Sequence, residues 1–343
     1  MLVTGGAGFI GSHACVELLD HGYELIVVDN YSNSTPQVFA RVERIAGRFV
    51  GAVYELDIRD RRALSAVFDR HSVDAVVHFA AHKAASESVR NPVPYYDTNI
   101  GGTTSLLRAM DEHDVHHLVF SSTAAVYGDA GHGPLSETTP TRPTTPYAAS
   151  KHTCEQILTD ICHRRPGFTA IALRYFNPTG AHPSGLLGED PCDTPDNLMP
   201  YLAQVAIGRR HRLRVHGDDY PTPDGTAVRD YLHIMDTVEA HRLALDHLTD
   251  HPGMHTYNLG FGKGHSVLDV VTAFSTACGT PVPYDIAARR PGDVPELVAD
   301  TTAVQHAWRW HPTRGLADMC ADAWRFQQLN PHGYAGTARR ATP

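Results

Sequence analysis

The glycine-rich stretch GGAGFIG, residues 5–11, constrains the fold of this chain more than any other feature. It follows a short apolar run at 2–4 and opens a helical pattern at 12–22. Its glycines keep the spacing GxxGxxG at Gly5, Gly8 and Gly11. Glycines so placed allow a tight turn, a close approach of the backbone to a pyrophosphate, and close packing of helix on strand. We therefore predict a dinucleotide-binding turn; the alternative is a glycine-rich turn without a ligand.

Acidic residues at the next two strand ends suit the adenosine half of such a cofactor. Asp29 ends the apolar run 24–29, 18 residues after Gly11. A carboxylate there accepts hydrogen bonds from the ribose hydroxyls and repels a 2′-phosphate, so we expect NAD rather than NADP. Asp57 and Ile58 follow at the end of a third predicted strand, where we expect the edge of the adenine.

Strand-like and helical segments alternate along the first half of the chain. The strand-like segments are continuous apolar runs rich in β-branched residues, which is typical of parallel strands covered on both faces. They lie at 2–4, 24–29, 75–80, 117–122 and 169–176. This alternation predicts an α/β protein with a Rossmann-like, doubly wound parallel sheet.

The second half of the chain differs from the first in its local composition. Gly and Pro gather at 177–191 and 216–230, with a predicted helix at 198–208 between them. Loops of this length are typical of binding segments. We expect the tail after Asn330 to be loosely ordered. We predict an NAD-binding domain at 1–176 and a smaller C-terminal α/β substrate-binding lobe at 177–343, with parts of 230–260 packing back on the first domain.

Composition and charge exclude several classes of protein. Hydrophobic residues at 42% and charged residues at 20% describe an ordinary soluble globular protein. A formal net charge of −9 argues against a nucleic-acid partner, which favours a basic face. No apolar run reaches the roughly 18 residues of a membrane span, and no signal peptide is visible, although the very short first strand points to a start slightly upstream. The six cysteines are far apart and the 23 histidines lack metal-ligand spacing, so we expect reduced thiols, no metal and a cytoplasmic location.

The string PYAASK, residues 146–151, places Tyr147 and Lys151 four positions apart on a predicted helix. Side chains at this spacing share one helix face. Taken alone, the pair is better explained as a half-buried tyrosine beside a solvated lysine. Beside a dinucleotide-binding turn, and with Thr123 closing the strand that begins at 117, it resembles the short-chain dehydrogenase/reductase superfamily in its extended branch. The resemblance implies that Tyr147, Lys151 and Thr123 are the catalytic residues.

The chemistry of alcohol oxidation explains this spacing. A sugar hydroxyl must lose its proton while hydride passes to nicotinamide, and lowering a tyrosine pKa from about 10 to about 7 takes about 4 kcal/mol. One lysine charge at about 6 Å, with an effective dielectric of about 20, supplies about 3 kcal/mol. We expect the positive nicotinamide ring to supply the rest. Tyr147 is then the general base and acid, and Lys151 tunes it and holds the cofactor ribose. Thr123 either hydrogen-bonds the reacting hydroxyl or shuttles its proton.

Longer strings in both halves, from Met1 to about Tyr334, resemble the UDP-galactose 4-epimerase family. They include HFAAHKAASESV, LRYFNPTGAHPSG, NLMPYLAQVAIGRR and DYPTPDGTAVRDYLHIMD. The resemblance implies tightly bound NAD⁺, a UDP-hexose substrate, and interconversion of UDP-glucose and UDP-galactose by inversion at C4 through a transient 4-keto intermediate. It also implies a homodimer paired through helices at 93–113 and 146–164, although core packing explains their apolar stripes equally well.

The same resemblance implies the binding residues one by one. The cofactor contacts are Gly5, Gly8, Phe9, Ile10, Gly11, Asp29, Asn30, Tyr31, Ser32, Asn33, Ser34, Asp57, Ile58, Phe79, Ala80, Ala81, Lys83, Thr98, Tyr147, Lys151 and Phe176. The substrate contacts are Lys83, Thr123, Tyr147, Tyr175, Asn177, Asn197, Leu198, Arg214, His216, Arg229, Arg290, Asp293 and Leu297. Arginine suits a diphosphate because its planar fork donates two parallel hydrogen bonds. Without the resemblance, each arginine and Lys83 would be read as surface charges.

Four positions depart from the family pattern. Thr98 stands where relatives often carry Asn, His216 where an aromatic side chain packs beside uracil, and Thr123 where Ser is commoner. Leu297 stands where a bulky Tyr restricts some relatives to unacetylated sugars, whereas small residues admit N-acetylhexosamines. Leucine is intermediate in bulk. We therefore favour UDP-glucose and UDP-galactose, with UDP-GlcNAc/UDP-GalNAc or dual specificity as the alternative.

Two other classes agree less well with the sequence. A nucleotide-sugar 4,6-dehydratase shares the fold and the Tyr-x-x-x-Lys pair, but it needs an acid pair after the threonine. This chain has Ala124 and Ala125 there, which cannot transfer protons. A non-catalytic NAD-binding protein has no need of Tyr147, Lys151 and Thr123 together.

Overall fold

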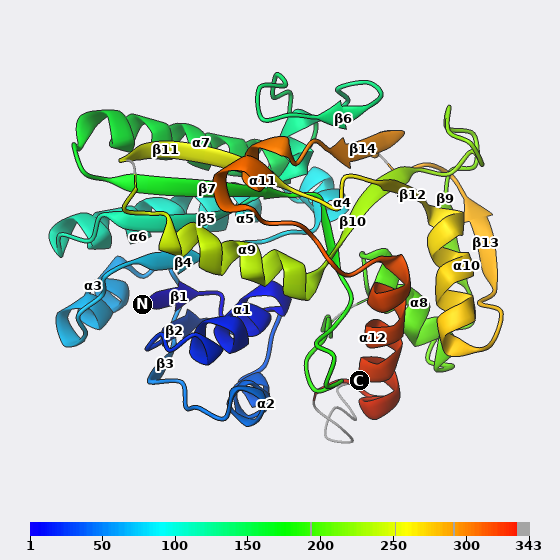
Figure 1. Ribbon diagram of the computed structural model, residues 1–343, viewed down its shortest axis with the longest axis horizontal. Helices are drawn as coiled ribbons and strands as arrows, with labels where there is room; N and C mark the ends of the chain where they lie inside the picture. Colours follow the sequence, from blue (N-terminus) through cyan, green and yellow to red (C-terminus); the bar gives the residue numbers. More distant parts are fainter. Residues whose placement is uncertain (193, 251, 291, 335–343) are drawn as a thin grey trace.

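A seven-stranded, all-parallel sheet forms the larger part of the molecule, shown in the computed structural model of Figure 1. The structure describes residues 1–192, 194–250, 252–290 and 292–334. The strand order is β11-β7-β5-β4-β1-β2-β3. The strands are β1 (Leu2–Thr4), β2 (Ile26–Asp29), β3 (Ala52–Glu55), β4 (Val76–His78), β5 (His117–Thr123), β7 (Thr169–Tyr175) and β11 (Gly253–Leu259).

Helices cover both faces of this sheet. Successive side chains of a strand point to opposite faces, so the neighbours Leu2 and Val3 of β1 belong to two separate apolar cores. One core is closed by α1 (Phe9–Asp20), α2 (Gln37–Ala46), α9 (Ile234–Asp246) and α11 (Thr302–Trp308). The other is closed by α3 (Arg61–Arg70), α6 (Gly102–Glu112) and α7 (Pro146–Arg164). The predicted α/β class with a doubly wound parallel sheet is confirmed.

The smaller part of the molecule contains two further sheets. Its five-stranded sheet has the order β12-β10-β14-β6, with β8 also paired to β10, and a separate pair joins β13 to β9. These strands are β6 (Pro134–Leu135), β8 (Asn177–Thr179), β9 (Leu213–His216), β10 (Val228–His233), β12 (Gly264–Ser266), β13 (Tyr284–Ala287) and β14 (Glu296–Ala299). A third apolar core lies beneath α8 (Leu198–Ala206), α10 (Val267–Cys278) and α12 (Leu316–Leu329).

The chain passes between the two parts more than once. Only Phe176 separates β7 of the larger sheet from β8 of the smaller one. Later, β11 pairs along its whole length with β7, so residues 253–259 lie at the edge of the larger sheet. In the other direction, β6 from the first half pairs with β14. The domain boundary at 176/177 stays a prediction.

The helix predictions held where the ends carry strong local signals. α7 spans Pro146–Arg164, as predicted, because the Thr145 side chain accepts a hydrogen bond from the Ala148 N–H and Pro146 occupies the first turn. The predicted helix at 93–113 is instead three pieces: α5 (Val93–Tyr95), a π-helical turn (Tyr96–Gly101) and α6. Of the described helices, none is long and apolar enough to cross a membrane.

The prediction of a loose tail after Asn330 is wrong for its first residues. The Tyr334 hydroxyl donates to the Gly188 carbonyl at 2.7 Å, and its backbone N–H donates to the Asp190 carboxylate at 2.8 Å. The Arg41 guanidinium stacks on the same ring, 4.7 Å from its centroid. These contacts fix the chain as far as 334, and residues 335–343 lie outside the described part.

Candidate active site

A cavity of about 640 Å³ lies along the carboxyl edge of the larger sheet and continues into the smaller part. This size is within the usual range for a small-molecule site. From β1 the chain adds β2 and β3 on one side of the larger sheet and then β4 on the other side, so the topological switch point lies between β1 and β4. Ligands of such sheets bind beyond the carboxyl ends of the strands at that point. The cavity reaches from this point to β9 and to the loop that follows β13.

The glycine turn forms one end of the cavity. A Cβ on Gly11 would lie 2.2 Å from the Gly5 carbonyl oxygen, and one on Gly5 would lie 2.6 Å from the Ala80 nitrogen. A Cβ on Gly8 would meet only the Gly5 oxygen, at 3.4 Å, so the space beside Gly8 is open. α1 begins at Phe9 without a side-chain cap, which leaves its first N–H groups available to an anion. The turn therefore fits the pyrophosphate of a dinucleotide.

Asp29 ties this turn to the loop after β2. One carboxylate oxygen accepts from the Ala7 N–H at 2.9 Å, and the other accepts from the Tyr31 N–H and the Ser34 hydroxyl at 2.8 and 2.9 Å. Asp29 is 7% exposed and lines the cavity. Its carboxylate thus stands at the predicted ribose end, already oriented by three donors.

Two predicted cofactor residues lie outside the cavity lining. Asp57 turns toward Arg59, which donates to both of its oxygens at 2.9 and 2.8 Å and holds the pKa of that carboxyl well below its usual range. Tyr31 packs against the apolar core instead, with a left-handed backbone at φ 54°. Arg59, which the sequence reasoning did not select, lines the cavity in their neighbourhood.

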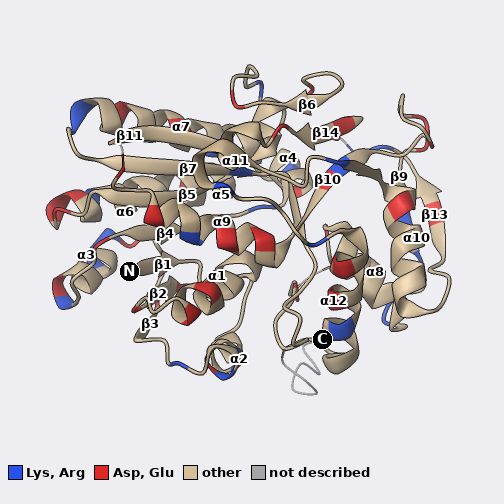
Figure 2. Ribbon diagram, viewed as in Figure 1, with Lys and Arg blue, Asp and Glu red and all other residues tan. Residues whose placement is uncertain are grey.

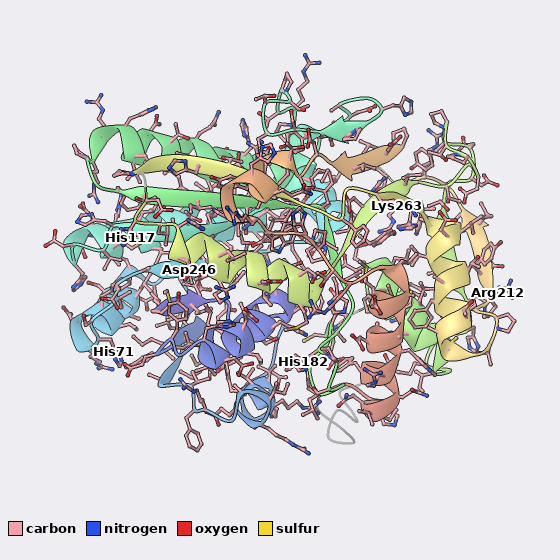
Figure 3. All side chains as sticks on the ribbon, in the orientation of Figure 1. His71, His117, His182, Arg212, Asp246 and Lys263 are labelled. Atoms are coloured by element: carbon pink, nitrogen blue, oxygen red, sulfur yellow. The ribbon has the colours of Figure 1, made fainter. Side chains whose placement is uncertain are left out.

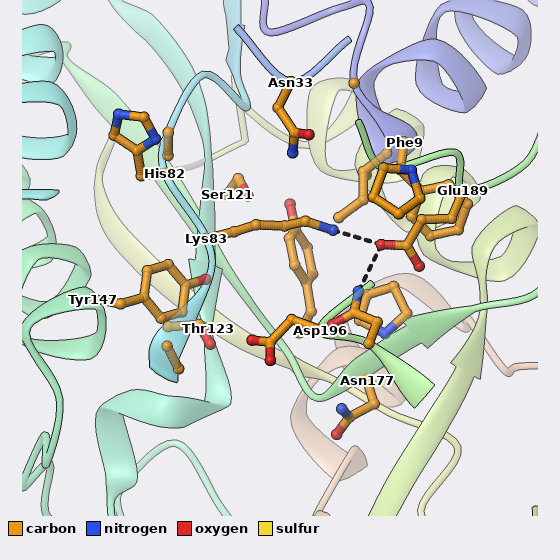
Figure 4. A pocket seen from close by; sticks show the side chains of 18 of the residues that line it. Phe9, Asn33, His82, Lys83, Ser121, Thr123, Tyr147, Asn177, Glu189 and Asp196 are labelled. Atoms are coloured by element: carbon orange, nitrogen blue, oxygen red, sulfur yellow. Dashed lines mark hydrogen bonds and ion pairs between the residues drawn. The ribbon is translucent and has the colours of Figure 1, made fainter. Parts of the chain in front are cut away.

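The Tyr147 and Thr123 side chains meet in the middle of the cavity (Figure 4). Thr123 ends β5 while Tyr147 lies in the first turn of α7, and both side chains line the cavity. Burial raises the pKa of Tyr147, and the nearby Thr123 hydroxyl opposes that rise. The phenol is therefore neutral near pH 7 in the chain alone.

Lys151, one turn further along α7, is 3% exposed. Its ammonium donates to the Ser121 carbonyl at 2.7 Å and lies 4.8 Å from the Phe120 ring centroid. Burial lowers the pKa of Lys151 to about 8, with Cys154 and Glu155 acting the other way. The lowered Tyr147 pKa expected from this lysine is not produced by the chain itself. Burial disfavours the phenolate and so raises the pKa of Tyr147, an effect that the sequence estimate left out.

A buried ion pair fixes α7 against β5 and β7. Glu155 accepts two hydrogen bonds from Arg174, at 3.0 and 2.7 Å, and one from the Ser122 hydroxyl at 2.5 Å. Burial alone would raise the pKa of Glu155, but these donors and His152 hold it below its usual range. Because Ser122 precedes Thr123 and Glu155 follows Lys151 by one turn, the Glu155–Arg174 pair holds the end of β5 against the first half of α7.

Charged side chains from both parts line the other end of the cavity. Glu189 accepts from Lys83 and from Asn197, both at 2.6 Å, as Figure 4 shows. Arg290 donates to Asp196 at 2.9 Å, and Arg229 lies 3.7 Å from Asp293. Sequence reasoning missed Glu189 and Asp196; the string GEDP contained the first, but nothing in it indicated the partners.

The cavity gathers most of the predicted binding residues. All predicted cofactor residues except Tyr31 and Asp57 line it, and so do all predicted substrate residues, including Tyr175, Arg214 and His216. Among those that sequence reasoning omitted, Ser121, Tyr334 and Met199 also line it. The individual roles stay predictions.

The described residues hold no group of three or more His, Cys, Asp or Glu side chains suited to a metal ion. Figure 3 shows His71, His117 and His182 on separate parts of the fold. Basic and acidic residues are interspersed over the ribbon in Figure 2. The charged groups relevant to a ligand are therefore those inside the cavity.

Comparison with known proteins decides the family. The model of the NAD dependent epimerase/dehydratase family matches residues 1–260. The chain belongs to this family. Among curated epimerases of the family, the UDP-glucose 4-epimerase of Yersinia pestis is 50% identical over 335 residues, covering 97% of this chain and 99% of the relative. That of Bacillus subtilis is 49% identical over 334 residues, covering 97% and 98%.

A solved structure of the same family extends the likeness to three dimensions. The UDP-glucose 4-epimerase of Bifidobacterium longum, determined in complex with NAD⁺ and UDP, superposes with a TM-score of 0.95. It is 48% identical, and the match covers 97% of this chain and 99% of that one. The epimerase fold thus extends over both parts of the molecule, including the part beyond residue 260.

Proposed function

We propose that this chain is an NAD-dependent UDP-glucose 4-epimerase that interconverts UDP-glucose and UDP-galactose. The observation that carries the proposal is the continuity of one cavity, which joins the glycine turn, the Tyr147–Thr123 pair and the arginines of the smaller part. A dinucleotide and a nucleotide sugar can therefore meet at one reacting carbon. The relatives at about 50% identity support the same activity.

Bound NAD⁺ supplies the group that takes hydride from C4 of the sugar and gives it back. The chain supplies the proton chemistry at the C4 oxygen. Tyr147 takes the hydroxyl proton and later returns it, and Thr123 holds the same oxygen through its own hydroxyl. Lys151 is anchored by the Ser121 carbonyl, so its positive charge stays beside the phenolate that forms. Because burial raises the pKa of Tyr147, its phenolate takes a proton readily, and the phenol gives that proton only to a stronger base such as the C4 alkoxide.

The residues after Thr123 argue for epimerisation over dehydration. Ala124 and Ala125 line the cavity and carry no group that transfers a proton. Removing water from C5 and C6 needs an acid and a base near those carbons, and neither alanine supplies one. The lining after Thr123 therefore favours reduction of a 4-keto sugar at C4 over loss of water. With NAD bound, reduction from the opposite face would invert the centre.

The sugar end is bounded by Leu297, which packs against an apolar cluster that contains Tyr127, Leu135 and Phe176. This wall favours the plain hexoses, UDP-glucose and UDP-galactose. Leucine lacks the reach of tyrosine, so UDP-GlcNAc and UDP-GalNAc are the second candidate pair.

The test is incubation of the purified enzyme with UDP-galactose, and separately with UDP-GalNAc, without added NAD. We expect UDP-glucose from the first and little product from the second, with NAD retained by the protein through purification. Tyr147→Phe should keep bound NAD and bind UDP while losing nearly all turnover. Unchanged turnover in that variant would refute the assignment, and net oxidation of the sugar would point to a dehydrogenase.

We also propose a homodimer in the cytoplasm. Val89, Val93 and Tyr96 expose 43%, 71% and 40% of their surface on neighbouring turns, which favours a covered apolar face. The buried thiols of Cys15, Cys154 and Cys320 suit a reducing compartment. A light-scattering mass near the 37.5 kDa of one chain would exclude the dimer, and fractionation of cells would test the location.

A further inference from the structure

Asp196 holds an unusual position at the mouth of the cavity. Both of its carboxylate oxygens lie 3.1 Å from the hydroxyl of Ser86, which belongs to α4 (Ala85–Arg90) of the larger part. One of them also accepts from Arg290 at 2.9 Å, and the Asp196 carbonyl accepts from the same guanidinium at 3.2 Å. The residue thus joins α4 to the loop that carries Arg290.

Arg290 is the side chain for which a diphosphate would compete. It lines the cavity with Arg229, and the two arginines face two carboxylates, Asp196 and Asp293. Its Nε atom is buried and has no hydrogen-bond partner within the described residues, while the nearest Asp293 oxygen is 3.9 Å away. The guanidinium therefore keeps one donor, Nε, without a hydrogen bond among the described residues.

The next residue reinforces the placement of Asp196. Asn197 donates to Glu189, which also pairs with Lys83. The dipeptide 196–197 is thereby tied to three separate parts of the chain, through Ser86, Glu189 and Arg290. Figure 4 shows Asp196 projecting into the cavity near Asn177 rather than away from it. Its charge therefore stays within the space that the ligand enters.

We propose that Asp196 is an internal competitor for the diphosphate of the substrate, and that it sets the affinity for UDP-sugars. The inference rests on the proposed function, because it assumes a nucleoside diphosphate at Arg290. In the absence of ligand, the Asp196 carboxylate accepts a hydrogen bond from the Arg290 guanidinium. When the diphosphate binds, it accepts the hydrogen bonds of Arg290 instead, and the Asp196 carboxylate remains unpaired close to a more negative ligand. The repulsion weakens ground-state binding and speeds release of the product.

The test compares Asp196→Asn with wild type and with Asp285→Asn, by calorimetric titration with UDP and with uridine. Asp285 lies on the exposed β13 and pairs with Arg212. Its substitution also removes one negative charge from an ion pair with arginine, but at a position outside the cavity lining. We expect Asp196→Asn to bind UDP about tenfold tighter, equivalent to about 1.4 kcal/mol. Uridine, which lacks the phosphates, should bind both enzymes alike, and Asp285→Asn should match wild type. The gain should shrink as salt is raised.

Kinetics separate this role from a structural one. In Asp196→Asn the KM for UDP-galactose should fall while kcat stays level or drops, because release slows. Asp196→Ser, which removes the same charge with a smaller side chain, should give the same shift. An unchanged or weaker affinity for UDP in both variants would overturn the inference while leaving the epimerase activity in place. Failure of the wild type to bind UDP would overturn the inference and the proposed substrate class together.

Discussion

Replacing Lys151 with methionine should stabilise the nucleotide-free protein at neutral pH. Burial lowers the pKa of this lysine from 10.5 to about 8, and only 3% of its surface is exposed. Between these two values the unfolded chain binds more protons than the folded one, so stability rises with pH. The buried charge therefore costs the fold about 3 kcal/mol at pH 7, and the cost fades as the pH approaches 10.5.

The substitution also removes favourable contacts. Methionine fills much of the same space, but the hydrogen bond to the Ser121 carbonyl and the contact with the Phe120 ring are lost. Together these contribute about 1–2 kcal/mol. We expect Lys151→Met to be more stable than wild type by about 1–2 kcal/mol at pH 7 and about as stable as wild type at pH 10, where the folded-state lysine is uncharged. It should also lose turnover.

Urea unfolding at pH 7, 8, 9 and 10 measures this difference by linear extrapolation. Lys263→Met, at an exposed lysine, is the matched control and should run parallel to wild type at every pH. The stability curves of Lys151→Met and wild type should converge as the pH rises from 7 to 10. Parallel curves from pH 7 to pH 10 would refute the reasoning that burial, rather than pairing, governs this lysine.

Three further predictions follow from the site. Gly11→Ala should lower the free energy of unfolding by about 1–3 kcal/mol and release the bound nucleotide, because its Cβ would lie 2.2 Å from a carbonyl oxygen. Gly8→Ala should keep the stability of wild type and lose only the nucleotide. The nucleotide content is measured by the absorbance of the supernatant after denaturation of the protein. Glu155→Gln should lower the free energy of unfolding by about 3 kcal/mol in urea titrations, because Arg174 is left buried without its counter-charge; a loss under about 1 kcal/mol would contradict this. Leu297→Ala should raise turnover of UDP-GalNAc relative to UDP-galactose about tenfold, measured by competing the two sugars, and an unchanged ratio would show that another residue limits the pocket.

Local patterns were enough to predict the framework of the site. Parallel strands expose their carboxyl ends at one edge, so the continuous apolar runs at 24–29, 117–122 and 169–176 predicted the edge at which a ligand binds. Thr145 and Pro146 determine the start of α7 from within the sequence itself. The spacing of Tyr147 and Lys151 on that helix then follows from helix geometry alone.

Pairings over long sequence distances could not be predicted. Glu189 meets Lys83 across 106 residues, and Asp196 meets Arg290 across 94. Such ion pairs depend on how two parts of the fold face each other, which no local pattern encodes. The same holds for Tyr334, whose sequence context of Gly, Pro and His indicated a loose tail, and whose ring is held by Gly188 and Arg41.

The pKa of Tyr147 shows a different limit. Counting one lysine charge against a phenol in solution predicted a lowered value, since both groups were treated as hydrated. In the folded chain both groups are buried, and burial disfavours the charged form of each, raising the pKa of Tyr147 and lowering that of Lys151. The catalytic role of the pair stays a prediction, and the sequence estimate overstated how far Lys151 lowers the pKa of Tyr147 without ligands.

The central claim is that one cavity both oxidises and reduces the same sugar carbon. UDP-galactose carrying deuterium at C4, incubated with the wild-type enzyme in ordinary water without added NAD, tests it most directly. We predict that the UDP-glucose formed keeps essentially all of the deuterium at C4 by mass spectrometry and NMR. Loss of that label to the solvent during conversion would contradict the claim.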